Sequence, residues 1–462
     1  MASDELLNAS ALDQARLIRE RKISSEELTR FYLNRISALN PRLTAFVAVY
    51  DEKALATARK KDAQVKRGDV LPAFHGIPMG IKDLNFVRGH VTRFGSRAVS
   101  VWSPLDCKST ASLRRAGFVI VGKTSTSELG PMPVTEPETH APTRNPWDPD
   151  ITSGGSSGGA GSAVAAGMLP LAHGSDGGGS VRIPASLNHL YGLKPSRGRV
   201  PNAYGQPDAN ILYSCGPLSR TVEDAAAMLD VLARLDITRP HWLAAPPGRF
   251  VELMKETPRK LRICLSVETS LAPTDPEIAD AVKRVARVLE GLGHTVEERP
   301  APQGTVEEFL PIWQRLLAQS PVIFPSRLQP VTRWLRDAGK RLKAKEVLDA
   351  QNRLSGRIIA AMQGYDLWLS PTIGVPSPLV GAWKDLSPSD AFGRAAALGV
   401  FTAPYNLTGQ PAASIPAGLR QNRWPMGAQL AAHIGQEALL LQVSRQLEEA
   451  KPWRTRWAPL AA

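Results

Sequence analysis

Glycine and serine are concentrated in residues 153–182, and this concentration limits the folds open to the chain. The stretch reads SGGSSGGAGSAVAAGMLPLAHGSDGGGSVR and holds ten of the 37 glycines. Two dense clusters, 153–159 and 174–180, flank the apolar segment 160–172. A flexible linker has no use for apolar residues at its centre. The pattern therefore predicts a short buried helix between two tight turns, where glycine lets backbone N–H groups approach a ligand closely.

The same clusters carry the residues of a nucleophilic site. Ser180 follows Gly177, Gly178 and Gly179, so four successive N–H groups can point toward one oxygen atom, as in an anion-binding nest. A serine hydroxyl that attacks an amide needs such donors, together with a base. The stretch therefore predicts a serine nucleophile with an oxyanion hole.

Lys82 offers a base for such a serine, because it lies near the end of the apolar strand predicted over residues 75–84. A solvated lysine has a pKa of about 10.4. Burial can lower that pKa by up to about 3–5 units. Since each unit corresponds to about 1.4 kcal/mol of lost stability, a lysine buried in this place indicates a function.

The chain resembles the amidase signature family in several separate motifs. They are GIPMGIKDL at 76–84, GGSSGG at 154–159, GSDGGGSVRIPAS at 174–186, GLKPSRGRV at 192–200, and FTAPYNLTGQPAASIPAGL near the C-terminus. The resemblance covers nearly the whole chain and implies one unit over residues 1–462. The expected fold is α/β: an α/β/α sandwich with a central mixed, mainly parallel β-sheet covered by helices on both faces. The alternation of predicted strands and helices agrees with it.

The resemblance also implies a catalytic Lys–Ser–Ser triad. It assigns the base to Lys82, the bridging serine to Ser156 and the nucleophile to Ser180, and it implies a cis Gly155–Ser156 peptide. The family places its two serines 24 residues apart, which selects Ser156 rather than Ser157 for the bridge.

The residues around the triad receive roles from the same resemblance. Gly130 and Ser156 are expected to contact the substrate. Where the family usually has threonine, this chain has Gly177, so we expect a more mobile loop. The oxyanion hole is assigned to the backbone of Gly177, Gly178, Gly179 and Ser180. The supporting residues are Ser157, Ser175, Asp176 and Arg182. We expect His173 to be structural, and we expect neither a metal site nor a cofactor.

Outside the motifs, the sequence predicts a helical layer over residues 1–70. Ser24 and Glu27 form a capping-box pattern for one of its helices, and Asn40 with Pro41 is expected to end that helix. The Pro-rich segment 130–150 is interpreted as a pocket wall. Residues 303–345 hold helices with several aromatic side chains. They are interpreted as a substrate-facing cap, with plain core packing as an equal alternative.

Composition excludes some classes of function. The net charge of +13 raises the question of nucleic acid, but the basic runs lack interleaved aromatic residues, so we expect solvated helix faces and no nucleic-acid partner. The three cysteines are far apart, which argues against disulfides and favours a reducing cytoplasm. The N-terminus MASDELLNAS lacks the segments of a signal peptide, and no apolar run is long enough to span a membrane. A homodimer stays open.

The function that these observations favour is hydrolysis of a small-molecule amide or carbamate through an acyl-enzyme on Ser180. The segment VTEPETHAPTRNPWD resembles the nylon-oligomer branch of the family, the aminohexanoate cyclic-dimer hydrolases. The alternative is the amidase subunit of a glutamyl-tRNA amidotransferase, against which Ile183 counts, since that subunit has glutamine there. A non-catalytic relative is a third interpretation, disfavoured because Lys82, Ser156 and Ser180 are all present. Amide, urethane and ester substrates are not separated by the sequence.

Overall fold

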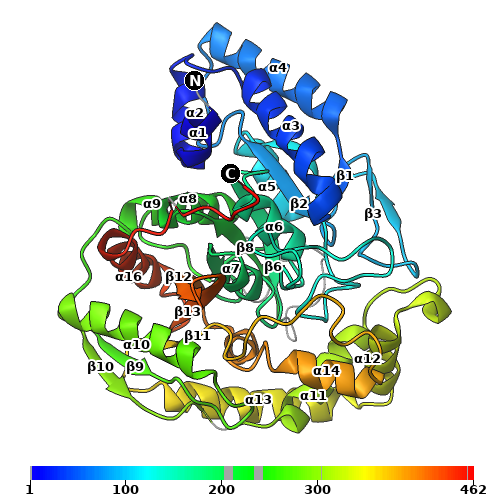
Figure 1. Ribbon diagram of the computed structural model, residues 1–462, viewed down its shortest axis with the longest axis vertical. Helices are drawn as coiled ribbons and strands as arrows, with labels where there is room; N and C mark the ends of the chain where they lie inside the picture. Colours follow the sequence, from blue (N-terminus) through cyan, green and yellow to red (C-terminus); the bar gives the residue numbers. More distant parts are fainter. Residues whose placement is uncertain (1–2, 202–211, 234–242, 303, 455, 462) are drawn as a thin grey trace.

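An 11-stranded sheet forms the centre of the protein in a computed structural model that describes residues 3–201, 212–233, 243–302, 304–454 and 456–461 (Figure 1). The strand order is β1-β5-β2-β6-β8-β7-β12-β13-β11-β9-β10, and β3 pairs with β4 in a separate hairpin. The strands are β1 (Phe46–Val49), β2 (Pro78–Lys82), β3 (His90–Thr92), β4 (Val101–Ser103), β5 (Val119–Thr124), β6 (Leu171–Asp176), β7 (Tyr191–Lys194), β8 (Ser214–Ser219), β9 (Arg262–Leu265), β10 (Thr295–Glu298), β11 (Leu367–Pro371), β12 (Ala412–Arg420) and β13 (Trp424–Ala432).

The sheet is mixed, and the two directions of pairing are segregated. Pairing is parallel within β5–β2–β6 and within β11–β9–β10. The strands between these blocks pair antiparallel, as does β1 at the edge. The short connection between β12 and β13 can join only antiparallel neighbours. The predicted mixed α/β fold is therefore confirmed, with parallel pairing confined to the two outer blocks and antiparallel pairing through the centre.

Helices cover both faces of the sheet because its strands are apolar on both sides. In β5, Ile120 packs into one core cluster, whereas Val119 and Val121 pack into another on the opposite face. Helices α6 and α7 lie on one face, and α8, α10 and α16 lie on the other. The helices are α1 (Ser3–Asn8), α2 (Ala11–Arg19), α3 (Ser25–Leu43), α4 (Asp51–Arg67), α5 (Lys108–Arg115), α6 (Gly158–Ala165), α7 (Arg182–Leu187), α8 (Val222–Leu232), α9 (Phe250–Leu253), α10 (Pro276–Gly291), α11 (Val306–Ala318), η2 (Pro325–Arg327), α12 (Pro330–Lys340), α13 (Ala344–Ala361), α14 (Pro388–Ala396), α15 (Ala403–Thr408) and α16 (Glu437–Ala450).

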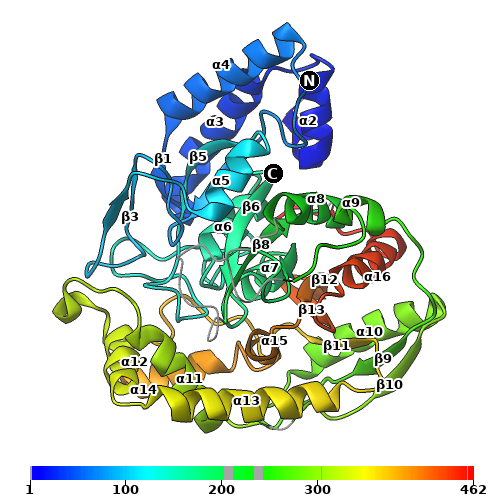
Figure 2. The same ribbon diagram turned by 180° about the vertical axis from the view of Figure 1, so that it is seen from behind.

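Helix α3 in the N-terminal part begins where its capping residues predict, but it ends later than expected. The capping box of Ser24 and Glu27 is present at the start of α3. The expected end of this helix at Asn40 and Pro41 is wrong, because the Thr44 N–H donates to the Asn40 carbonyl and closes the last turn at Leu43. In both views these helices lie at one end of the molecule, and α11–α14 gather at the other (Figure 2).

The apolar segment between the two glycine clusters is part helix and part strand. The predicted helix over residues 160–172 ends with α6 at Ala165, and Gly167 turns the chain in a left-handed conformation with φ 65°. The chain then enters β6, which pairs in parallel with β2. Because the carboxyl ends of parallel strands meet at one edge of a sheet, Asp176 at the end of β6 lies near Lys82 at the end of β2.

Residues 306–361 form three helices that pack on one another. Their shared core contains Trp313 and Leu317 of α11, Leu335 of α12 and Leu354 of α13. Where α11 and α12 cross, Gly339 allows the two backbones to touch: a Cβ atom added there would lie 2.0 Å from the Gln314 carbonyl oxygen. None of the helices in the described ranges has the length and apolar character needed to cross a membrane.

We predict that Gly339→Ala separates α11 from α12 and lowers stability by about 1–3 kcal/mol, the usual cost of overpacking. The matched control is Gly356→Ala in α13, where an added Cβ meets nothing within 4 Å. Alanine is favoured over glycine in a helix by about 1 kcal/mol, so this control should be slightly stabilised. Thermal unfolding measures both, and equal stability of the two variants would contradict the prediction.

Candidate active site

Lys82 ends β2 with its side chain completely buried. Its Nζ donates to Ser156 Oγ at 2.7 Å and to the Ser175 carbonyl oxygen at 3.1 Å. Burial lowers the pKa of Lys82 to about 7, against the opposing effect of Asp176 and Cys215. A lysine with such a pKa is partly neutral near pH 7, so it can accept a proton from a bound hydroxyl.

Ser156 lies between Lys82 and the predicted substrate-binding glycine. The Gly155–Ser156 peptide is cis, which confirms the expectation from the sequence. A Cβ atom added at Gly130 would lie 3.5 Å from Ser156 Oγ, so the two predicted substrate contacts are neighbours. Gly155 itself has no room for a side chain, because an added Cβ would lie 2.7 Å from the backbone of Val134.

Ser157 and Ser175 connect the segment that carries Ser156 with the segment that carries Ser180. Ser157 Oγ donates to the Ser175 carbonyl at 3.2 Å and accepts the Ser175 N–H at 3.3 Å. The Ser157 N–H donates to the Ser180 carbonyl at 3.2 Å. Because the same Ser175 carbonyl accepts from Lys82, these contacts hold the lysine and both serine segments in one network.

Ser180 is the member of the predicted triad that faces the pocket. It lies on the loop between β6 and α7, and 7% of its surface is exposed. Among the described residues, its hydroxyl has no hydrogen bond to Ser156 Oγ. The structure therefore has the Lys82–Ser156 hydrogen bond of the predicted triad but not the Ser156–Ser180 hydrogen bond. Catalytic hydrogen bonds are often long before a substrate is bound.

Asp176 organises the loop that carries Ser180, and it uses one of the four predicted oxyanion donors. Its carboxylate accepts the N–H of Gly179 at 2.8 Å and that of Val181 at 3.1 Å. The predicted set therefore needs a correction, since the Gly179 N–H is directed inward. The N–H groups of Gly177, Gly178 and Ser180 have no acceptor among the described residues, and these three can face a negatively charged oxygen.

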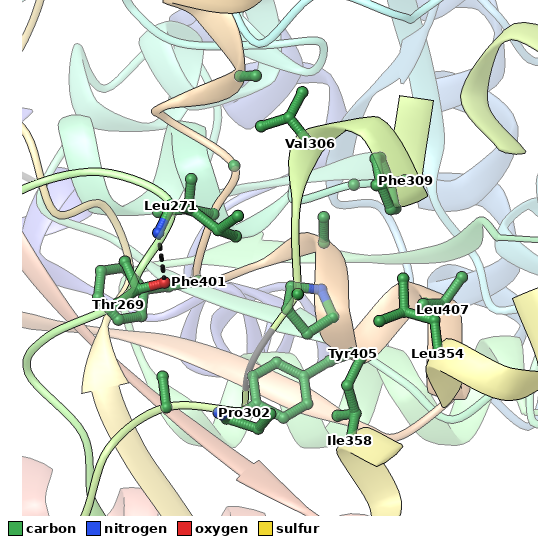
Figure 3. Close-up of a pocket in the computed structure, with 18 of the residues that line it drawn as sticks. Thr269, Leu271, Pro302, Val306, Phe309, Leu354, Ile358, Phe401, Tyr405 and Leu407 are labelled. Atoms are coloured by element: carbon green, nitrogen blue, oxygen red, sulfur yellow. Dashed lines mark hydrogen bonds between the residues drawn. The ribbon is translucent and has the colours of Figure 1, made fainter. Parts of the chain in front are cut away.

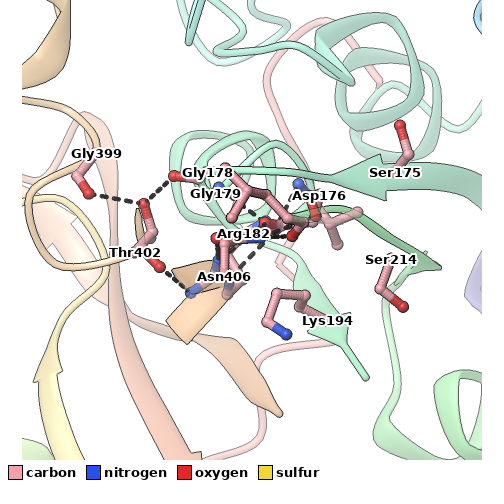
Figure 4. A network of polar contacts seen from close by, with 12 residues as sticks. Ser175, Asp176, Gly178, Gly179, Arg182, Lys194, Ser214, Gly399, Thr402 and Asn406 are labelled. Atoms are coloured by element: carbon pink, nitrogen blue, oxygen red, sulfur yellow. Dashed lines mark hydrogen bonds and ion pairs between the residues drawn. The ribbon is translucent and has the colours of Figure 1, made fainter. Parts of the chain in front are cut away.

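Arg182 is completely buried and holds Asp176 through two parallel contacts, Nε to Oδ2 and Nη2 to Oδ1, both 2.9 Å. It also donates to Gln429 Oε1, Asn406 Oδ1 and the Thr402 carbonyl. Burial alone would raise the pKa of Asp176, but the charge of Arg182 holds it below its ordinary value. Figure 4 shows this network converging on the Ser180 loop.

Two residues that position the loop received no role from the sequence. Asn406 donates to the Asp176 carboxylate at 2.9 Å, and Thr402 Oγ1 donates to the Gly178 carbonyl at 2.6 Å. Both belong to the C-terminal segment FTAPYNLTGQPAASIPAGL. The resemblance of this segment to the family indicated that it matters, but it did not indicate which of its residues contact the Ser180 loop.

Trp313 of α11 covers the loop from the pocket side. Cβ atoms added at Gly178 and Gly177 would lie 3.3 and 3.6 Å from its Cη2 atom. The sequence placed Trp313 among the aromatic residues of segment 303–345 without choosing between a cap and a core. It packs in the helical core with Leu317 and Leu335, and it also lines the pocket beside Ser180.

His173 lies on the strand next to Lys82 and opposite Ile81, but no hydrogen bond in the described part of the chain joins its ring to the predicted triad. His173 is buried in β6, and burial lowers its pKa to about 3, so it is neutral at pH 7. No group of three His, Cys, Asp or Glu side chains in the described part of the chain is arranged to hold a metal ion.

We predict that Arg182→Met destabilises the protein by about 3–5 kcal/mol, because it leaves the Asp176 carboxylate buried without its partner. The control is Arg16→Met, which removes a contact to Asp13 between two largely exposed side chains and should leave stability unchanged within error. Denaturant unfolding measures both, and an Arg182→Met variant as stable as the control would contradict this account of the loop.

The pocket beside Ser180 is lined by apolar side chains. It is bounded by Pro131 and Pro133 on one side and by α11, α13 and the segment 392–407 on the others. Figure 3 shows Phe309, Leu354 and Tyr405 around this space. The Pro-rich segment 130–150 thus contributes to a pocket wall, as its composition predicted.

Known proteins resemble this chain over most of its length. A family model described as Amidase matches residues 27–441. A putative amidase of Synechocystis sp. is 38% identical over 449 residues, which cover 95% of this chain and 88% of that protein. The solved structure of 6-aminohexanoate cyclic dimer hydrolase with its substrate has a TM-score of 0.90 at 29% identity and covers 99% of this chain and 100% of its own. A bacterial aryl acylamidase of the amidase signature family has a TM-score of 0.86 at 25% identity, covering 96% of each chain. The chain therefore belongs to the amidase signature family and is an amidohydrolase that acts on amides.

Proposed function

We propose that this amidase works through an acyl-enzyme on Ser180, with Ser156 as the bridging residue and Lys82 as the base. The observation that carries the proposal is the fully buried Lys82, whose Nζ lies 2.7 Å from Ser156 Oγ. A buried lysine in contact with a serine hydroxyl has little structural use, but a neutral amine in this place is a base.

In the proposed reaction, Ser180 Oγ attacks the amide carbonyl while its proton passes to Ser156 and from Ser156 to neutral Lys82. The negative oxygen of the tetrahedral intermediate accepts from the N–H groups of Gly177, Gly178 and Ser180. The relay returns the proton to the nitrogen of the leaving amine, the C–N bond breaks, and water then releases the acyl group from Ser180. The Ser180 and Ser156 hydroxyls close their contact when substrate binds.

The substrate is proposed to be a small-molecule amide, with carbamates and esters as further substrates. Hydrolysis of a cyclic or linear oligoamide is supported by the likeness to 6-aminohexanoate cyclic dimer hydrolase, and hydrolysis of an anilide by the likeness to the aryl acylamidase. The alternative of a glutamyl-tRNA amidotransferase subunit is disfavoured by Ile183, which lines the pocket.

The protein is proposed to act in the cytoplasm without a nucleic-acid or membrane partner, as a monomer or a homodimer. Support comes from the cysteines: Cys107, Cys215 and Cys264 are buried with free thiols, as is usual in a reducing compartment.

We predict that Ser180→Ala abolishes hydrolysis of both an anilide and the 4-nitrophenyl ester of the same acid. Lys82→Ala should remove anilide hydrolysis but retain part of the ester activity, because nitrophenolate leaves without a proton. The control is Lys194→Met, which replaces another buried lysine whose pKa is also about 7 and whose Nζ contacts the Pro195 carbonyl. It should keep the wild-type ratio of the two activities. Equal loss of both activities in Lys82→Ala would contradict the relay.

We predict that anilide kcat/KM rises about tenfold per pH unit below pH 7 and levels above it, because Lys82 accepts a proton only in its neutral form and its pKa is about 7. Lys82→Arg provides the control, since a guanidinium stays protonated and should give no rising limb. Tryptophan fluorescence at each pH verifies that the protein is folded. A flat wild-type profile between pH 5 and 8 would exclude Lys82 as the base.

A further inference from the structure

Among the residues that the structure describes, those in the wall of the pocket beside Ser180 carry no charged side chain. Its lining residues in the described part of the chain include neither Asp, Glu, Lys, Arg nor His. They come from the region after β9, from residues 301–302 and 304–309, from α13 and from residues 392–407, so separate parts of the chain each turn uncharged side chains toward the pocket. In Figure 3 the side chains of Phe309, Leu354, Ile358 and Leu407 surround the space. This contrasts with the net charge of +13 carried by the chain as a whole.

The hydroxyl groups in this wall are uncharged, and several of them already take part in hydrogen bonds within the protein. Ser266 Oγ donates to the Arg299 carbonyl at 2.7 Å, and Ser370 Oγ donates to the Pro371 carbonyl at 3.0 Å. Tyr405 keeps its proton at neutral pH, since burial raises the pKa of its hydroxyl well above its ordinary value. The described residues of the wall therefore offer no counter-charge to an ion that enters beside Ser180.

We propose that this pocket binds an uncharged apolar substituent of the amide, an alkyl chain or an aryl ring, and excludes carboxylate and ammonium groups. The inference rests on the proposed function and specifies its substrate class. Neutral cyclic oligoamides, alkyl amides and anilides fit the pocket, whereas linear amino-acid oligomers with a charged end and the amide of free glutamine do not.

The physical basis is the unequal cost of burying the two kinds of group. Each methylene moved from water to an apolar wall favours binding about three- to fourfold. An ion moved into the same wall without a partner loses its hydration and gains nothing in return. A charge at the end of the substituent should therefore cancel the gain in kcat/KM that a longer alkyl chain brings.

The test compares two series of amides on the wild-type enzyme. The first varies the acyl group of a 4-nitroanilide: butanoyl, hexanoyl, 6-aminohexanoyl and the monoanilide of adipic acid. The second varies the amine of N-alkyl acetamides in the same way. In the series whose variable part occupies the pocket, we expect about a tenfold rise in kcat/KM from butanoyl to hexanoyl, or the equivalent pair of amines, and about a hundredfold fall on adding either charge. Charged and neutral members cleaved equally well in both series would overturn the proposal.

A pair of variants on α13 tests whether the preference for uncharged substituents arises in this pocket. Ile358 lines the pocket, whereas its neighbour Ile359 is exposed and does not line it. Ile358→Lys should reduce the advantage of the hexanoyl chain at least tenfold and raise the relative rate of the adipic acid derivative. Ile359→Lys should keep the wild-type preference. If Ile358→Lys does not fold, the two wild-type series decide the question alone.

Failure of this proposal can be separated from failure of the proposed function. Hydrolysis that persists in Ser180→Ala contradicts the acyl-enzyme, whatever the substrate preference. Hydrolysis that depends on Ser180 but ignores terminal charge contradicts only the apolar substrate class. Calorimetric binding of the same compounds to Ser180→Ala gives the ranking where turnover is slow, and equal affinity for neutral and charged members would again overturn it.

Discussion

The ion pair between Arg182 and Asp176 is the interaction on which the site depends. Asp176 ends a central strand and Arg182 begins a helix, so their two parallel contacts close the loop that carries Ser180. The remaining Arg182 donors reach Asn406 near the pocket and Gln429 on β13. A completely buried guanidinium is stable only when its donors are satisfied, so this one arginine fixes the loop relative to both the sheet and the helix α15.

The Ser180 loop and Lys82, the proposed base, are positioned by the same edge of the sheet. Lys82 and Asp176 end neighbouring parallel strands. The buried amine therefore lies beside the start of the Ser180 loop, where it donates to the carbonyl of Ser175. Burial lowers the pKa of the Lys82 amine to about 7, so the amine is partly neutral near pH 7, whereas the Asp176 carboxylate keeps its charge because Arg182 compensates it. In one buried region, burial thus favours the neutral form of the lysine, whereas the ion pair with Arg182 favours the charged form of the aspartate.

Local patterns predicted most of the fold, and the family resemblance supplied the proposed catalytic residues. The capping box at Ser24, the end of a strand at Lys82 and the cis peptide before Ser156 were all readable from short motifs, and the structure has each of them. The end of α6 was misplaced because Ala-rich sequence is compatible with both helix and strand, and only Gly167 marks the change. The direction of the Gly179 N–H could not be read either, since it depends on where Asp176 places its carboxylate.

Trp313 shows why the substrate side of the site lies beyond the motifs. The missing side chain at Gly177 predicted a looser loop, yet the loop lies under an indole ring supplied by α11, more than a hundred residues along the chain. A Cβ atom at position 177 would already be in van der Waals contact with that ring, 3.6 Å from Cη2, so the ring limits the room for a larger side chain there. Glycine at 177 and tryptophan at 313 therefore fit together as a pair, and neither residue alone predicts this contact from the sequence. The short motifs identify the family, whereas contacts of this kind between the Ser180 loop and α11 shape the pocket beside Ser180.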